Sequence, residues 1–149
     1  MSTVVIKRAE TDDEILSIIP LKQSDDSECI KQQVPEEVAL QRVIEWREMH
    51  YDVWMAKAGL DVVGYAVGKR QDGGYRSYGI YVEPAHRNRG IGTLLKNAQI
   101  EHARKCYCEY IWSNVSENNK PSIRVQEKHG FEFERSGAGY VVTKSLKDF

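Results

Sequence analysis

The stretch HRNRGIG, residues His86 to Gly92, decides what the rest of the chain can be. It contains two arginines and two glycines. Residues 75–82, which precede it, have the composition of a buried strand, and the residues that follow it have the apolar period of a helix. Main-chain N–H groups at a helix start bind phosphate because the helix dipole adds to them, and glycine lets the anion approach closely. Arg87 and Arg89 can pair with the remaining phosphate charge. The stretch therefore predicts a site for a polyphosphate ligand.

Two better-known phosphate loops do not fit this stretch. A P-loop would end in Gly-Lys-Ser/Thr, which is absent here. A dinucleotide fingerprint would need a third glycine where the chain has Leu95, and it would follow the first strand of the fold. The simpler alternative, in which the glycines permit tight packing and the arginines are solvated, stays open from the residues alone.

The residues after the loop predict a helix and a parallel strand crossover. Ile91, Leu94, Leu95 and Ala98 recur at i, i+3, i+4 and i+7, which indicates an amphipathic helix running to about residue 107. The next strand is expected at residues 110–115. A strand, helix and strand in this order normally join parallel neighbours through a right-handed crossover.

The remaining patterns predict an α/β fold with about seven strands and about four helices. The β-type runs share β-branched or aromatic residues between turn signals: residues 4–8, 53–58, 62–69, 75–82, 110–115, 131–135 and 140–144. Helical signals occur at 15–21, from Pro35 onward, at 91–107 and at 118–130. Thr11 and Glu14 have the spacing of a capping box before the first helix. Residues 22–34 are polar and are expected to form a loop.

Composition limits the possible partners. A chain of 149 residues suits a single domain, 1–149, and the formal charge of −1 gives no bulk attraction to nucleic acid or to an acidic membrane. Apolar runs are too short to span a membrane. Three cysteines, Cys29, Cys106 and Cys108, lack the spacing of a zinc site, so we expect no metal and predict reduced thiols in the cytoplasm.

Two segments resemble the GNAT superfamily of acetyl-CoA-dependent N-acyltransferases. Residues 82–92 resemble its cofactor motif, Arg/Gln-x-x-Gly-x-Gly/Ala after a strand that ends in Val-x-Pro. Asn119-x-x-Ser122 followed by residues 127–131, Glu-Lys-His-Gly-Phe, is similar to the Asn-x-x-Ala/Ser and Glu-Lys-x-Gly-Phe segment of that family. The element order matches too, so the resemblance covers nearly the whole chain. It implies a mixed, mostly antiparallel sheet in which parallel strands four and five splay apart.

The resemblance also implies acetyl-CoA as the cosubstrate. Main-chain groups of the loop would hold its pyrophosphate: Arg87, Asn88, Arg89, Gly90, Ile91, Gly92 and Thr93. The pantetheine arm would lie between the splayed strands, and the N–H of Val82 would bind the thioester carbonyl in an oxyanion-hole role. Asn119 and Ser122 would contact the arm from the other side.

One departure from the family pattern concerns the leaving thiolate. The family often carries a tyrosine that protonates it, where this sequence has Gln126. A glutamine can donate a hydrogen bond but has no acidic proton. Ser122 and His129, on the same predicted helix, are candidate replacements, although packing or capping roles would also explain them.

The acceptor side carries acidic and aromatic candidates. Glu83, next to Val82, is a candidate general base, or else a solvated carboxylate. The predicted loop holds acidic residues that would attract a cationic amine, or that serve solubility alone: Asp25, Asp26 and Glu28. Tyr81 and Tyr140 either line the acceptor cleft or pack as strand residues.

These observations support an N-acetyltransferase acting on a primary amine of a small molecule or a peptide. A non-catalytic acyl-CoA sensor or interaction module of the same fold is the alternative, motivated by Gln126. A nucleotide-binding domain is a third hypothesis. The resemblance is compatible with a homodimer.

Overall fold

The computed structural model describes residues 3–147, so the first and last two residues of the expected 1–149 domain lie outside the described part of the chain. Seven strands form one sheet in the order β1-β2-β3-β4-β5-β7-β6. The strands are β1 (Val4–Arg8), β2 (Asp52–Ala58), β3 (Asp61–Gln71), β4 (Gly74–Val82), β5 (Tyr110–Ser116), β6 (Glu132–Ser136) and β7 (Gly139–Ser145). The helices are α1 (Asp12–Leu16), α2 (Ile19–Ile30), α3 (Glu36–Glu48), α4 (Ile91–Lys105) and α5 (Lys120–Lys128), with a short 3₁₀ helix, η1 (Pro84–His86).

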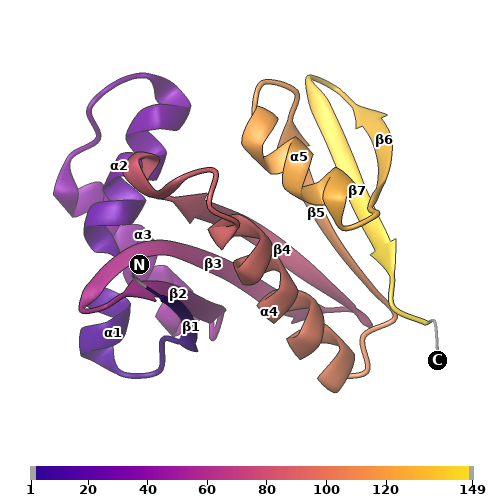
Figure 1. The fold of residues 1–149 in the computed structure, drawn as a ribbon, viewed down its shortest axis with the longest axis horizontal. Helices are drawn as coiled ribbons and strands as arrows, with labels where there is room; N and C mark the ends of the chain where they lie inside the picture. The colour runs from indigo at the N-terminus through magenta and orange to yellow at the C-terminus, as the bar shows by residue number, and fades with distance from the viewer. Residues whose placement is uncertain (1–2, 148–149) are drawn as a thin grey trace.

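The sheet consists of two antiparallel halves joined by one short parallel contact. Strands β1 to β4 form a meander, and β5, β7 and β6 form the second half. The parallel pairing of β4 with β5 runs only from Gly74 opposite Tyr110 to Arg76 opposite Trp112. Beyond Arg76 the two strands diverge, as Figure 1 shows. The predicted mixed sheet with splayed strands four and five is therefore confirmed.

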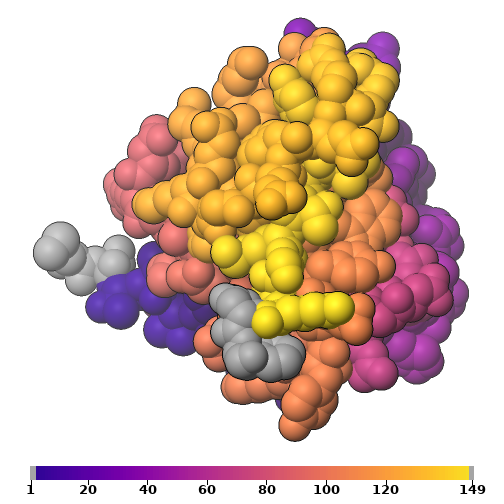
Figure 2. Space-filling model, turned by 90° about the vertical axis from the view of Figure 1, so that its right-hand side faces the viewer, coloured from indigo at the N-terminus to yellow at the C-terminus, as the bar shows by residue number. Residues whose placement is uncertain are grey.

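Helices cover both faces of the sheet, and each face has its own apolar core (Figure 1). On one face α4 and α5 bury a cluster that includes Leu95 and Phe131. On the other, α1 to α3 bury a cluster that includes Val43 and Tyr65. Figure 2 views the side on which the C-terminal strands (yellow) lie beside α5 and β5 (orange). Within residues 3–147, no helix combines the length and the apolar composition needed to cross a membrane.

The expected loop over residues 22–34 is wrong, because most of it belongs to α2. Only Ile19 and Leu21 of this helix are buried, so the apolar periodicity that would have predicted it is nearly absent. Local bonds support the helix: Lys22 Nζ pairs with Asp26 Oδ1 at 2.7 Å, four residues on, and Ser27 Oγ donates to the carbonyl of Gln23 at 2.7 Å. The first expected helix is accordingly divided into α1 and α2.

Other local signals behave as expected. Thr11 and Glu14 form the predicted capping box at the start of α1. Pro35 is the N-cap of α3 and stands one residue before the helix.

Candidate cofactor and acceptor site

The loop between β4 and α4 turns sharply through two left-handed residues. Asn88 has φ 65° and Gly90, the N-cap of α4, has φ 81°. An added Cβ at Gly90 would meet no atom within 4 Å, so the backbone conformation, and not crowding, favours glycine there. A glycine offers no side chain to cap the helix, so the first N–H groups of α4 are left for solvent or a ligand.

Gly92 lies where three elements meet. A Cβ added there would lie 3.4 Å from a methyl group of Val125 on α5 and 4.0 Å from one of Val82 on β4. The start of α4 therefore lies directly beside the end of β4 and the middle of α5. Phosphate binding at this loop would be close to the open end of the splay.

The main chain of Val82 faces the divergence between β4 and β5. Glu83 N–H donates to the carbonyl of Val63 on β3 at 2.8 Å. Main-chain groups of successive strand residues point to opposite sides, so those of Val82 point away from β3. Its carbonyl accepts a bond from Arg87 Nε at 2.8 Å. The N–H of Val82 consequently points toward the region that β4 and β5 leave between them.

Arg87 connects the loop to the other face of the sheet. Its Nη2 donates to both carboxylate oxygens of Glu28 on α2, at 3.1 and 2.9 Å. Its guanidinium carbon lies 5.4 Å from the ring centroid of Tyr81. Arg87 thus ties the loop to α2, whereas the side chain of Arg89, the other arginine predicted to pair with phosphate, is exposed.

Two tyrosines on the sheet pair with two carboxylates on α2. Tyr65 and Tyr81 are directly opposite each other on β3 and β4, with ring centroids 5.9 Å apart. Tyr65 donates its hydroxyl to Asp25, and Tyr81 donates to Glu28 Oε1 at 2.8 Å. Asp25 and Glu28 are three residues apart on one helix face, which matches the spacing of the hydroxyl groups. Sequence reasoning missed Tyr65, because its position opposite Tyr81 depends on the register shift between Val67 and Gly68 on β3.

Burial controls the protonation of this cluster. It raises the pKa of Asp25, and the hydrogen bond from Tyr65 partly offsets that effect. Burial, followed by the bond to Glu28, raises the pKa of Tyr81, and burial with the Asp25 charge raises that of Tyr65. Both hydroxyl groups are therefore neutral donors at physiological pH.

Two predicted acceptor residues lie elsewhere. Asp26 pairs with Lys22 at 2.7 Å and with Arg42 at 3.5 Å, which links α2 to α3. Tyr140 on β7 packs edge-on against Phe133 on β6, with centroids 5.5 Å apart, in the core under α4 and α5. The structure does not bring either of them to the cluster of Asp25, Glu28 and the two tyrosines.

The predicted residues of α5 divide into capping and buried positions. Asn119 is the N-cap of α5 and accepts the N–H of Ser122 at 3.2 Å. His129 contacts the carbonyl of Val125 at 2.8 Å and Asn97 at 2.9 Å. Gln126 is 4% exposed, and its Oε1 has no hydrogen-bond partner among the described residues.

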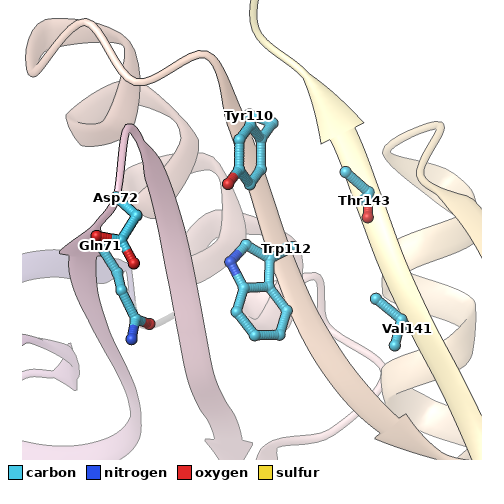
Figure 3. A pocket seen from close by; sticks show the side chains of 6 residues that line it. All are labelled: Gln71, Asp72, Tyr110, Trp112, Val141 and Thr143. Carbon is cyan, nitrogen blue, oxygen red and sulfur yellow. The ribbon is translucent and has the colours of Figure 1, made fainter.

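A surface hollow of about 330 Å³ lies at the other end of the β4–β5 junction (Figure 3). Its lining comes from the β3–β4 turn, β5 and β7: Gln71, Asp72, Tyr110, Trp112, Val141 and Thr143. None of the predicted site residues lines it. It lies at the closed end of the strand pair, far along β4 from Val82.

The splayed sheet and the glycine loop before the crossover helix define an α/β protein in which a candidate anion site lies beside the main-chain amide of Val82. The chain belongs to the Acetyltransferase (GNAT) family, whose model matches residues 6–131. The resemblance in the sequence is thereby confirmed.

Two curated relatives match the chain over part of their length. It is 31% identical over 86 residues to L-methionine sulfoximine/L-methionine sulfone acetyltransferase of Salmonella typhimurium, covering 54% of this chain and 50% of that protein. It is 35% identical over 54 residues to streptothricin acetyltransferase of Streptomyces lavendulae, covering 36% of this chain and 29% of that protein. The chain thus matches half or less of the length of these relatives.

Solved structures show the same fold. YncA of Salmonella typhimurium, solved with acetyl-CoA, superposes with a TM-score of 0.75 at 18% identity, over 98% of this chain and 95% of that one. The PaiA N-acetyltransferase of Thermoplasma acidophilum, in complex with coenzyme A, gives a TM-score of 0.77 at 15% identity, over 97% and 99% of the two chains.

Proposed function

We propose that this protein is an N-acetyltransferase that transfers the acetyl group of acetyl-CoA to a primary amine by direct attack on the thioester. The observation that carries the proposal is the position of the Val82 N–H. It faces the divergence of β4 from β5, and Val82 also lies beside Gly92 at the start of α4. One ligand with a diphosphate and a thioester would engage both features.

The loop residues fit the diphosphate of such a ligand. The proposed contacts come from main-chain groups of residues 87–93 and from the exposed side chain of Arg89. Arg87 holds the loop in place through Val82 and Glu28. Asn119, the N-cap of α5, and Ser122, in its first turn, would contact the pantetheine arm from the side opposite Val82.

The chemistry requires a neutral amine and a stabilised oxyanion. The Val82 N–H would donate to the carbonyl oxygen as negative charge develops there, an effect worth a few kcal/mol in comparable sites. Glu83, adjacent to Val82, remains the candidate that accepts the amine proton. Gln126 can assist the leaving thiolate only as a hydrogen-bond donor.

Asp25, Glu28 and Tyr81 form the proposed acceptor side. Negative charge attracts an ammonium group, and Tyr81 lies next to Val82 in the sequence. The names of the two curated relatives, which concern methionine sulfoximine or sulfone and streptothricin, support a small amine as acceptor. The proposal also includes a single domain over residues 1–149 and a cytoplasmic location in which the cysteines are reduced. The three cysteines form no disulfide in the structure, which supports this part of the proposal.

A non-catalytic acyl-CoA binder is the second candidate, since Gln126 replaces the tyrosine of the family pattern. Incubation with acetyl-CoA and a panel of amines, with detection of free thiol, separates the two. The panel holds methionine sulfoximine, streptothricin, lysine and a peptide with a free N-terminus. Thiol release with one amine supports the enzyme; coenzyme A binding without release with any amine supports the binder.

Binding measurements without an acceptor test the cofactor. Calorimetric titration with coenzyme A should give saturable heat, and ATP should compete weakly. A ligand at about 100 times its dissociation constant stabilises the fold by about 2.7 kcal/mol, which a thermal shift detects. Stabilisation by ATP but not by coenzyme A would overturn the assignment in favour of a nucleotide-binding domain.

A further inference from the structure

Three buried polar atoms near the splay lack hydrogen-bond partners among the described residues. They are Nζ of Lys96, Oγ of Ser113 and Oε1 of Gln126. The three residues are 0%, 4% and 4% exposed. Buried polar groups are nearly always hydrogen-bonded, so three exceptions in one region require an explanation.

Lys96 and Gln126 face the same interior from α4 and α5. Lys96 is one turn along α4 from Gly92 and therefore on the same helix face. Gly92 lies against Val125, the residue before Gln126. Lys96 Nζ lies 4.7 Å from the ring centroid of Phe131, and the N–H of Phe131 donates to the Gln126 carbonyl at 3.1 Å. Phe131 is thus a shared neighbour of both residues.

Ser113 reaches this interior from the sheet. It lies on the same face of β5 as Ile111 and Val115, which pack in one core cluster with Leu95 and Phe131. It is also the first residue of β5 beyond the last pair with β4, Arg76 opposite Trp112. Ser113 therefore lies where the splay begins, on the face of the sheet that α4 and α5 cover.

Resting on the function proposed above, we propose that Lys96 is the catalytic acid that protonates the departing thiolate of coenzyme A. The position of the missing family tyrosine is occupied by Gln126, which has no acidic proton, and Lys96 is a buried ionisable group that shares the neighbour Phe131 with it. Ser113 and Gln126 are positioning residues, each with an oxygen that can accept a hydrogen bond from the Lys96 ammonium group.

In the proposed step, a proton moves from Lys96 to sulfur as the thiol departs. The amine nitrogen bonds to the thioester carbon, and collapse of the tetrahedral intermediate breaks the C–S bond and leaves the electron pair on sulfur. An N–H proton of the Lys96 ammonium transfers to sulfur, which yields the free thiol and a neutral amine. The attacking nitrogen loses its proton to the base or to solvent, and Lys96 regains a proton from solvent before the next turnover.

The electrostatic environment of the Lys96 amine suits this role. Burial alone lowers the pKa of Lys96 to about 7, so its proton is transferred readily near neutral pH. The titratable groups of neighbouring elements are engaged elsewhere: His129 with Asn97 and Val125, and Lys144 with the carbonyl of His129. A thiolate forming nearby would be an opposite charge in a medium of low dielectric constant, where the attraction is strong.

The test measures the thiol of bound coenzyme A and needs no acceptor. Coenzyme A is bound to wild type, to Lys96→Met and to a control variant, Lys105→Met. Lys105 is an exposed lysine of the same helix. Thiolate formation is followed by ultraviolet absorbance as the pH is raised. We expect the bound thiol to ionise at least about tenfold more readily in wild type and Lys105→Met than in Lys96→Met, corresponding to about one pH unit. Lys96→Gln repeats the measurement with a polar side chain in case Lys96→Met folds poorly.

The outcomes separate this inference from the proposed function. If wild type does not bind coenzyme A in calorimetry, both fail. If it binds and the thiol titrates identically in all variants, Lys96 is not the acid, and its buried amine serves structure or holds a water molecule.

Turnover provides a second readout once an acceptor is known. Lys96→Met should lower kcat with little change in KM for acetyl-CoA, and should remove the fall in kcat above about pH 7 that deprotonation of Lys96 predicts. Adding Gln126→Tyr to Lys96→Met should restore kcat at least in part. A structural role alone would not produce that rescue, so its absence together with an unchanged pH profile would overturn the inference.

Discussion

Glu28 and Arg87, 59 residues apart in the sequence, are joined by two hydrogen bonds of 2.9 and 3.1 Å. The same guanidinium also donates to the carbonyl of Val82 at 2.8 Å. Arg87 therefore links α2, the helix over the proposed acceptor side, to the end of β4 and to the loop before α4. Any change at Glu28 reaches both halves of the proposed site.

Replacing Glu28 by glutamine should affect catalysis more than stability. The Arg87 and Glu28 side chains are 33% and 44% exposed, so losing the ion pair should cost less than about 1 kcal/mol in the free energy of unfolding. Loss of the negative charge should raise KM for a cationic amine several-fold and leave Arg87 less firmly held. Denaturant unfolding and steady-state kinetics check this, with the exposed Glu48→Gln on α3 as the control. Equal kinetics for the two variants would show that Glu28 does not contact the acceptor.

Much of the fold followed from local sequence chemistry. Turn signals between the β-type runs at 62–69 and 75–82 predicted the β3–β4 hairpin, and the structure places Asp72 and Gly73 in left-handed conformations there. The period of apolar residues predicted α4. Helix α2 could not be predicted in this way, because it buries only Ile19 and Leu21 and its polar residues are paired within the helix or with other elements.

Residues of both halves of the candidate site were predictable from the sequence, but the contacts of the acceptor half were not. The glycines and arginines of the loop are contiguous in the sequence and carry a motif. The contacts of Asp25 with Tyr65 and of Glu28 with Arg87 depend on how α2 docks on the sheet. Lys96 gave no signal either, since a lysine in an amphipathic helix is normally at the surface.

Gly92 should tolerate alanine but not glutamate. A Cβ there would make ordinary contacts of 3.4 Å with Val125 and 4.0 Å with Val82, whereas a carboxylate would enter the proposed diphosphate site and repel it. We expect Gly92→Glu to weaken coenzyme A binding at least about 100-fold, or about 2.7 kcal/mol, and Gly92→Ala to weaken it far less. Calorimetry measures both, and thermal unfolding verifies that the two variants are folded. Equal affinities for the two variants would place the cofactor elsewhere.

Asp25 should make the protein less stable as the pH rises. Burial raises its pKa above the usual 3.8, so the folded state binds more protons than the unfolded state between the two values. Stability is therefore lost as the pH rises through the folded-state pKa. Asp25→Asn keeps an acceptor for the Tyr65 hydroxyl and should remove this loss.

Tyr65→Phe tests the hydrogen bond between Tyr65 and Asp25 from the donor side. It leaves the Asp25 carboxylate without the Tyr65 bond and should cost about 1 to 3 kcal/mol at neutral pH. Urea unfolding of wild type and both variants at pH 5 and pH 7 compares these effects. A pH dependence in Asp25→Asn identical to that of wild type would contradict the burial argument.

Lys96 should have the opposite effect on the pH dependence of stability. Its pKa is lowered in the folded state from 10.5 to about 7 by burial, so between these values the unfolded state binds more protons. Stability should rise with pH across that window, and below about pH 7 the full penalty of burying the charge should remain. Lys96→Met removes this effect and should be the more stable protein at and below neutral pH, by at most about 5 kcal/mol, since one pH unit corresponds to about 1.4 kcal/mol. Denaturant unfolding between pH 6 and pH 9 measures the difference, with Lys105→Met expected to follow wild type. Parallel curves for wild type and Lys96→Met would mean that the amine stays charged in the folded protein, stabilised by contacts such as that with the Phe131 ring, and would contradict the burial argument.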